Sequence, residues 1–246
     1  MKFGYVYETG KRKENEDALL YRLCLFSRGE LAILAVCDGM GGMDCGMEAS
    51  AICIREIETW FDGELIPFLE NQKGGEKMLI RGIQSKGFTL YRRINQILFE
   101  KMRLEGKKMG TTALLCLLYR GRYYLFHIGD GRAYLQRKAF WPGGLKKLTK
   151  DHGDNRGLSK CLGLNKEWKP DFYTGICKAG GILLCTDGFY RKYDKKLWKS
   201  CLALRKLQND AAISKRLREI GNYNIRQGET DNLSALYAGW MGEKCR

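Results

Sequence analysis

Apolar runs of strand length recur along the chain, and glycine or aspartate ends most of them. Two runs stop at Asp38-Gly39 and Asp187-Gly188, and Gly121 divides two others as in a hairpin. Short apolar runs bounded by turn residues are typical of buried strands. We therefore expect strands over residues 31–37, 112–119, 123–128, 133–136, 181–185 and 233–238.

Helical periodicity fills the intervals between these runs. We expect helices over residues 48–61, 76–103, 195–207 and 211–223. In the first, Ile54, Ile57 and Phe61 form an apolar stripe. The expected buried face of the second consists of Ile83, Phe88, Tyr91, Ile94, Ile97 and Leu98. Strands in runs and helices in pairs favour the α+β class, with antiparallel sheets covered by helices.

The composition is that of a globular protein. The chain has 246 residues, of which 44% are hydrophobic and 29% charged, and we expect one domain over residues 1–246. No apolar run approaches the roughly 20 residues of a membrane span, and the N-terminus lacks the apolar core of a signal peptide. We therefore expect a cytoplasmic protein with no membrane contact. The ten cysteines form no CxxC pair, which favours reduced thiols.

The net charge of +15 attracts anionic partners. The basic residues are spread along the chain without an aromatic–basic recognition motif, so we expect no nucleic-acid binding. A basic surface that attracts phosphorylated proteins is the preferred interpretation.

Carboxylates lie at the ends of the predicted core elements. They belong to Glu16-Asp17, Asp38-Gly39, Asp187-Gly188 and Asp231-Asn232. An isolated Asp-Gly pair is most often a turn, but gathered carboxylates raise each other's pKa and a cation removes that cost. Mg²⁺ and Mn²⁺ prefer oxygen ligands. Since the chain has only two histidines, a histidine-based zinc site is hard to assemble.

The ordered set of short motifs resembles the metal-dependent, type 2C protein serine/threonine phosphatases in their compact bacterial form. The matching segments span nearly the whole chain. They are Arg12-Lys13-Glu14-Asn15-Glu16-Asp17, Val36-Cys37-Asp38-Gly39-Met40-Gly41-Gly42, Met109-Gly110-Thr111-Thr112, Ile128-Gly129-Asp130-Gly131-Arg132-Ala133-Tyr134, Leu148-Thr149-Lys150-Asp151-His152, Leu184-Cys185-Thr186-Asp187-Gly188-Phe189 and Thr230-Asp231-Asn232.

The resemblance implies a four-layer α-β-β-α sandwich and a role for each matching residue. Two core Mn²⁺ or Mg²⁺ ions are implied, with a weaker third ion. The implied assignments are Asp38 bridging the core pair, the Gly39 carbonyl as a further ligand, Glu16 on one ion, Asp187 and Asp231 on the other, Asp17 holding metal-bound water, Asp130 helping to hold the third ion, and Arg12 binding the substrate phosphate.

The implied reaction is hydrolysis of phosphoserine and phosphothreonine in proteins by direct attack of a metal-bridging water. Such an enzyme would reverse a serine/threonine kinase in bacterial signalling, and we expect a monomer. Two alternatives stay open. The chain could be a catalytically weak regulatory or binding module with this fold, or a phosphatase for phosphotyrosine or small phosphate esters.

Two departures from the family pattern affect these expectations. Gly131 stands where the family usually has serine, which bears on third-ion affinity. The flap segment after His152 is short, which predicts a more open site with altered substrate preference. Among the remaining motif residues, Thr111 and Thr112 are expected to position the site. His127 is expected to be structural, and His152 lies near the expected edge of the site, where a general-acid role is an alternative.

Overall fold

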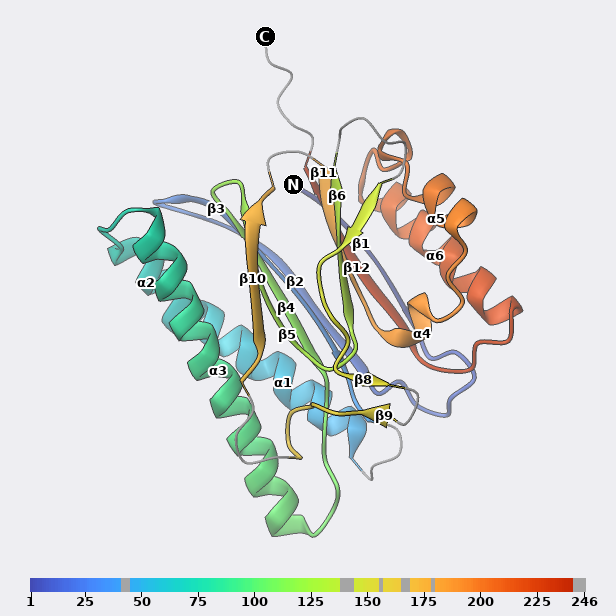
Figure 1. Ribbon diagram of the computed structural model, residues 1–246, viewed down its shortest axis with the longest axis horizontal. Helices are drawn as coiled ribbons and strands as arrows, with labels where there is room; N and C mark the ends of the chain where they lie inside the picture. The colour runs from blue at the N-terminus through green and yellow to red at the C-terminus, as the bar shows by residue number, and fades with distance from the viewer. Residues whose placement is uncertain (41–44, 138–143, 155–156, 165–168, 178–179, 241–246) are drawn as a thin grey trace.

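Two five-stranded antiparallel sheets lie face to face in the computed structural model (Figure 1). The structure describes residues 1–40, 45–137, 144–154, 157–164, 169–177 and 180–240. The first sheet contains, in spatial order, β10 (Asp171–Ile176), β5 (Arg122–Ile128), β4 (Ala113–Tyr119), β3 (Gly29–Asp38) and β2 (Asp17–Phe26). The second contains β1 (Lys2–Glu8), β12 (Leu233–Trp240), β11 (Gly180–Cys185), β6 (Arg132–Arg137) and β7 (Leu145–Lys147). A small separate hairpin pairs β8 (Gly153–Asp154) with β9 (Gly157–Leu158).

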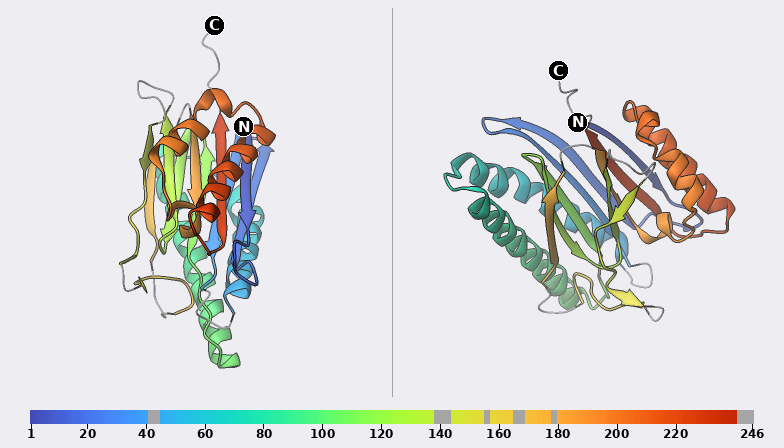
Figure 2. Two further views of the ribbon diagram at one scale, coloured as in Figure 1. Left: turned by 90° about the vertical axis from the view of Figure 1, so that its right-hand side faces the viewer. Right: turned by 45° about the horizontal axis from the view of Figure 1, so that its top comes forward.

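Helices cover the outer face of each sheet. On the first sheet lie α1 (Gly46–Trp60), a π-helical segment (Phe61–Leu65), α2 (Ile66–Asn71) and α3 (Glu76–Glu105). On the second lie α4 (Asp187–Tyr190), α5 (Lys195–Cys201), a 3₁₀ turn (Leu204–Lys206) and α6 (Asp210–Arg226). Figure 2 shows the resulting order of helices, sheet, sheet and helices. The expected α+β class and four-layer α-β-β-α sandwich are confirmed.

The apolar runs are continuous because both faces of the central strands are buried. In β3, Leu31 and Ile33 pack against the helices of the first layer, while Ala32 and Leu34 pack between the two sheets. Successive side chains of a strand point to opposite faces, so burial on both faces replaces alternation with an unbroken run. The turn between β4 and β5 needs a positive φ at both central residues, and Arg120 and Gly121 have φ of 50° and 69°. The predicted hairpin is confirmed.

Several elements differ from the sequence prediction. The edge strands β1, β2 and β10 were not predicted, because edge strands are half exposed and carry no continuous apolar run. The helix expected over residues 195–207 ends at Cys201. In α1, Ile54 is only partly buried, and the buried face runs instead through residues such as Cys53, Ile57 and Trp60. Phe88 and Ile97 of α3 are likewise only partly buried.

The strand topology brings the acidic motifs to one end of the sandwich. β3 ends at Asp38, and β2 begins at Asp17 directly beside it. β11 ends just before Asp187, and β12 begins just after Asp231. The N-terminus and the last residues of β12, which pair with the start of β1, lie at the other end, toward the top of Figure 1. No helix among the described residues has the length and apolar character needed to cross a membrane.

Candidate metal centre

Asn232 ties the loop that carries Arg12 and Glu16 to the start of β12. Its Nδ2 donates hydrogen bonds to the carbonyl oxygens of Thr9 and Glu14, at 2.9 and 3.0 Å. Its Oδ1 accepts the backbone N–H of Glu16 at 2.9 Å. The asparagine of the Asp231-Asn232 motif therefore places the first acidic motif beside the last, although some 215 residues separate them in sequence.

Thr111 and Thr112, which precede β4, hold the backbone of Asp38 through their hydroxyl groups. Its N–H donates to Thr112 Oγ1 at 3.0 Å, and its carbonyl oxygen accepts from Thr111 Oγ1 at 3.0 Å. Both contacts are those of positioning residues. The next residue must be small, since a Cβ atom on Gly39 would lie 2.1 Å from the Gly46 carbonyl oxygen. This close approach sets the start of α1 against the end of β3.

Glu16 and Asp17 point to different environments. A Cβ atom on Gly46 would lie 2.6 Å from Glu16 Oε1, so the Glu16 carboxylate lies directly against the N-terminus of α1. A helix N-terminus favours a negative charge. Asp17 is buried, and its Oδ2 accepts a hydrogen bond from Thr186 Oγ1 at 3.1 Å. The other oxygen, Asp17 Oδ1, is buried without a hydrogen-bond partner.

The carboxyl groups of this end, of which Asp17 is buried and the others are half-buried, raise one another's pKa. Burial is the largest cause at Asp38, whose pKa lies well above its usual value, and Asp17, Asp187, Asp130 and Asp231 add to the shift. Burial raises the pKa of Asp17 to about 7, with Asp187 and Asp231 contributing. Burial and Asp130 raise the pKa of Asp187, also to about 7. The fold therefore brings these five predicted aspartates into one electrostatic unit.

Among the described residues, Arg12 and Arg191 contact this unit. Arg12 lies 3.0 Å from Asp231 Oδ1, and its side chain is 45% exposed, so its guanidinium faces both the acidic cluster and solvent. Arg191 follows α4 and pairs with Asp187, with Asp231 at 3.2 Å and with Glu229 at 3.3 Å. Sequence reasoning did not identify Arg191 or Glu229. The only sequence signal was the i, i+4 spacing of Asp187 and Arg191, which many helices share.

The donor set fits hard divalent cations. All predicted ligands are oxygen donors, the carboxyl groups repel one another, and a buried Asp17 oxygen has no partner. Among the described residues, these aspartates do not form a group of three ligand atoms within 4.8 Å of one another. Within the described part of the chain, three ligand atoms lie within 4.8 Å of each other in two other groups, His127–His152–Asp171 and Cys45–Glu48–Glu105.

The histidine group does not have the protonation of a metal site. His152 Nδ1 accepts the Gly129 N–H at 3.1 Å, so the ring proton of neutral His152 is on Nε2, 3.1 Å from Asp171 Oδ2. A cation would need the lone pair that this proton occupies. His127 is buried and its ring stacks on that of His152, with centroids 4.7 Å apart. The two rings therefore pack against each other, and His152 is already engaged by Asp171.

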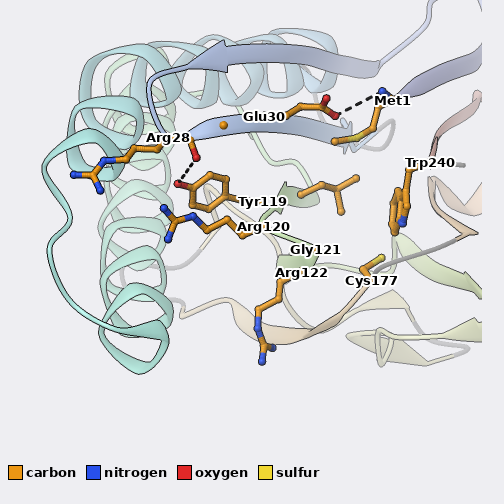
Figure 3. A pocket seen from close by; sticks show the side chains of 11 residues that line it. Met1, Arg28, Glu30, Tyr119, Arg120, Gly121, Arg122, Cys177 and Trp240 are labelled. Atoms are coloured by element: carbon orange, nitrogen blue, oxygen red, sulfur yellow. Dashed lines mark hydrogen bonds and ion pairs between the residues drawn. The ribbon is translucent and has the colours of Figure 1, made fainter. Parts of the chain in front are cut away.

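A cavity of about 560 Å³ lies at the opposite end of the sandwich (Figure 3). Met1, Tyr119 and Trp240 line it together with three arginines. The side chains of Arg28 and Arg122 point in different directions, so their charges do not converge on one ligand (Figure 3). The cavity is therefore separate from the acidic centre and lacks its chemistry.

Of the remaining motif residues, Asp130 is among the described residues, whereas Gly41 and Gly42 are not. Asp130 follows β5, and its carbonyl oxygen accepts a hydrogen bond from Tyr190 at 3.0 Å. Residues 155–156 of the shortened flap also lie outside the described residues. No disulfide joins the cysteines in the part of the chain that is described.

Comparisons with known proteins agree with the motifs and the fold. The profile of the family described as Protein phosphatase 2C matches residues 9–233. A Mycoplasma genitalium protein is 28% identical over 91% of this chain and 89% of its own length. Serine/threonine protein phosphatase PstP of Mycobacterium tuberculosis is 27% identical over 84% of this chain, a match that covers 40% of PstP.

Solved structures of this family superpose on almost the whole chain. A bacterial serine phosphatase matches with a TM-score of 0.79 at 21% identity, over 99% of each chain. The catalytic domain of PstP, in complex with two manganese ions, matches with a TM-score of 0.73 at 25% identity, over 98% of each chain. The expectation of a serine/threonine protein phosphatase is confirmed, and the chain belongs to the protein phosphatase 2C family.

Proposed function

We propose that this protein hydrolyses phosphoserine and phosphothreonine in proteins and that the reaction depends on two Mn²⁺ or Mg²⁺ ions. The observation that carries the proposal is the cluster of buried and half-buried, mutually repelling carboxyl groups at one end of the sandwich. A protein keeps such a cluster at a cost in stability unless cations neutralise it. PstP, a relative with the same fold, binds two manganese ions.

The residues that would hold the ions follow from the motifs and their positions. Asp38 would bridge the core pair, Glu16 and the Gly39 carbonyl would complete one side, and Asp187 and Asp231 the other. Asp17 is buried opposite Asp38 in the strand register and would orient water rather than contact an ion. Asp130 would help to hold a weaker third ion. When bound, the ions would lower the pKa of a bridging water for direct attack and neutralise charge on the phosphate.

Arg12 is the substrate-facing group of the proposed site. Its guanidinium is half exposed and lies 3.0 Å from Asp231, so it borders the acidic cluster on the solvent side. The planar guanidinium can hold two phosphate oxygens at once and stabilise charge on them as the ester bond breaks. Pairing with Asp231 fixes the arginine near the cluster, and a phosphate would be the second anion that it binds.

In the cell, we propose, the protein is a cytoplasmic monomer that reverses a serine/threonine kinase. Its charge of +15 favours phosphorylated protein substrates. The short flap after His152 would leave the site open and shift substrate preference.

Phosphate release tests the proposal. Phosphothreonine, phosphoserine and phosphotyrosine peptides and p-nitrophenyl phosphate would be compared with Mn²⁺, with Mg²⁺ and with chelator, and Asp38→Asn would serve as the inactive control. Metal-dependent turnover of phosphothreonine and phosphoserine peptides supports the proposal. If the protein hydrolyses the phosphotyrosine peptide faster, or hydrolyses only p-nitrophenyl phosphate, its substrates are phosphotyrosine or small phosphate esters instead. A folded protein without turnover under any condition would favour the regulatory module.

A further inference from the structure

Arg191 occupies a position among carboxylates that the proposed ions would share. Its Nη2 bonds to Asp187 Oδ2, and its Nη1 lies 3.2 Å from Asp231 Oδ2. These two aspartates are the proposed ligands of one ion. A single guanidinium therefore bridges the two carboxylates.

Glu229 anchors the arginine in this position. Its side chain is 4% exposed, and its Oε1 lies 3.3 Å from Arg191 Nη1. The same oxygen accepts the backbone N–H groups of Thr230 at 3.0 Å and Asp231 at 3.2 Å. Because Glu229 is fixed by the backbone of the Asp231 loop, the guanidinium is held beside the metal-ligand set and not free in solvent.

Arg191 is the counter-charge of the carboxylates around it. Three carboxylates contact the guanidinium directly, while the aspartates themselves do not converge on one point among the described residues. The arginine thus neutralises carboxylates that would otherwise repel each other.

We propose that Arg191, whose side chain is 46% exposed, is a cation of the protein itself that competes with one metal ion for Asp187 and Asp231. The inference rests on the proposed function, since it concerns the same carboxylates. An entering ion must displace the guanidinium from both aspartates, while Glu229 retains it nearby. This competition lowers the affinity of the site for this ion below its affinity for the other core ion. Arg191 therefore sets the Mn²⁺ concentration at which both ions are bound.

Calorimetric titration with Mn²⁺ tests the competition without any turnover. The variants are Arg191→Met and Arg191→Gln, which remove the charge, and Arg191→Lys, which keeps it. Arg216→Met is the matched control, because Arg216 pairs with Glu219 at 2.7 Å on α6 and contacts none of the proposed ligands. The loss of charge-assisted hydrogen bonds to two carboxylates predicts that one Mn²⁺ binds about tenfold more tightly in the Met and Gln variants. The Lys variant and the control should stay near wild type.

Thermal unfolding in chelator gives a second readout. The Met and Gln variants should unfold at a lower temperature than the Arg216→Met control, since the carboxylates lose their counter-charge. Saturating Mn²⁺ should then raise their unfolding temperature by more than it raises that of the wild type.

The outcomes separate this inference from the proposed function. Tighter Mn²⁺ binding with lower metal-free stability supports the inference. Equal or weaker Mn²⁺ binding in both uncharged variants would overturn it and leave the proposed function standing, with Arg191 as a residue that positions the ligands. If neither the folded wild type nor its variants bind Mn²⁺, the proposed function fails and the inference fails with it.

Discussion

Asp17 lies directly opposite Asp38 in the register of β2 and β3, so a buried and a half-buried carboxyl group share one end of a strand pair. The backbone pairing fixes their separation, and neither strand can move without breaking the sheet. Their pKa values are both raised, mainly by burial. The sheet therefore holds a repulsion that a bound cation would relieve.

The first prediction concerns Asp38→Asn. The change removes one charge from the pair, so the metal-free protein should become more stable, while Mn²⁺ binding should weaken and turnover should fall at least about 100-fold. Chemical denaturation in chelator measures the first effect, and calorimetry and phosphate release measure the others. Asp17→Asn is the matched control: it should also stabilise the metal-free protein but should reduce Mn²⁺ affinity less. Equal losses of Mn²⁺ affinity in both variants would contradict the proposal that Asp17 orients water and does not contact an ion.

The second prediction concerns Arg12→Ala. Removing a bidentate phosphate contact should lower kcat/KM for a phosphothreonine peptide by about 10- to 100-fold, while the number of bound Mn²⁺ ions stays the same. Arg12→Lys keeps the charge but loses the planar fork, and should recover only part of the loss. Steady-state kinetics and calorimetry on the same samples make the comparison. An unchanged kcat/KM in Arg12→Ala would remove this residue from the substrate site.

The third prediction concerns acid stability and His127. Burial is the main cause that lowers the pKa of His127 to about 4, with His152 adding to it. The unfolded chain then binds a proton at higher pH than the folded protein, so this contribution is present at neutral pH and is lost as pH falls from the unfolded value toward 4. The loss at full protonation is about 3 kcal/mol.

His127→Phe should remove this part of the pH dependence. Urea unfolding of the wild type and the variant in chelator, at pH 7 and near pH 4.5, measures the difference. The wild type should lose more stability between the two conditions than the variant does, because only it must charge a buried ring. Equal losses would show that His127 is already solvated or bonded in its charged form.

The fourth prediction concerns Asp130→Ala. The variant should keep both tightly bound Mn²⁺ ions and lose turnover, since the proposed role of Asp130 is on a weaker third ion. Calorimetry counts the ions, and phosphate release follows activity at rising Mn²⁺ concentration. Asp151→Ala, which removes the partner of Arg132 at 2.7 Å, is a nearby control for general disturbance of the loop. Loss of all Mn²⁺ binding in Asp130→Ala would place Asp130 in the core pair.

The position of the acidic centre was predictable because its parts carry local signals. Asp38 and Asp187 each follow an apolar run, and their motifs recur in a fixed order in a known family. Arg191 and Glu229 carry no such signal. An arginine four residues after an aspartate is common on solvated helices, and only the loop of Asp231 brings Glu229 to it.

The sequence by itself determined the central strands, the α+β class and the identity of the candidate ligands. It could do so because burial on both faces leaves unbroken apolar runs, and because oxygen donors at strand ends suit hard cations. The edge strands β1, β2 and β10 were left to the tertiary structure, since half-exposed strands need neighbours to define them.

Only the tertiary structure decided which charges meet. The antiparallel register places Asp17 against Asp38, the bonds of Asn232 bring the first motif to the last, and Glu229 holds Arg191 over two proposed ligands. These relationships join residues far apart in sequence, and electrostatic interactions depend on distance and burial in space. The residue types can be read from the chain, whereas the balance between an internal arginine and a bound ion exists only once the sheets and loops are assembled.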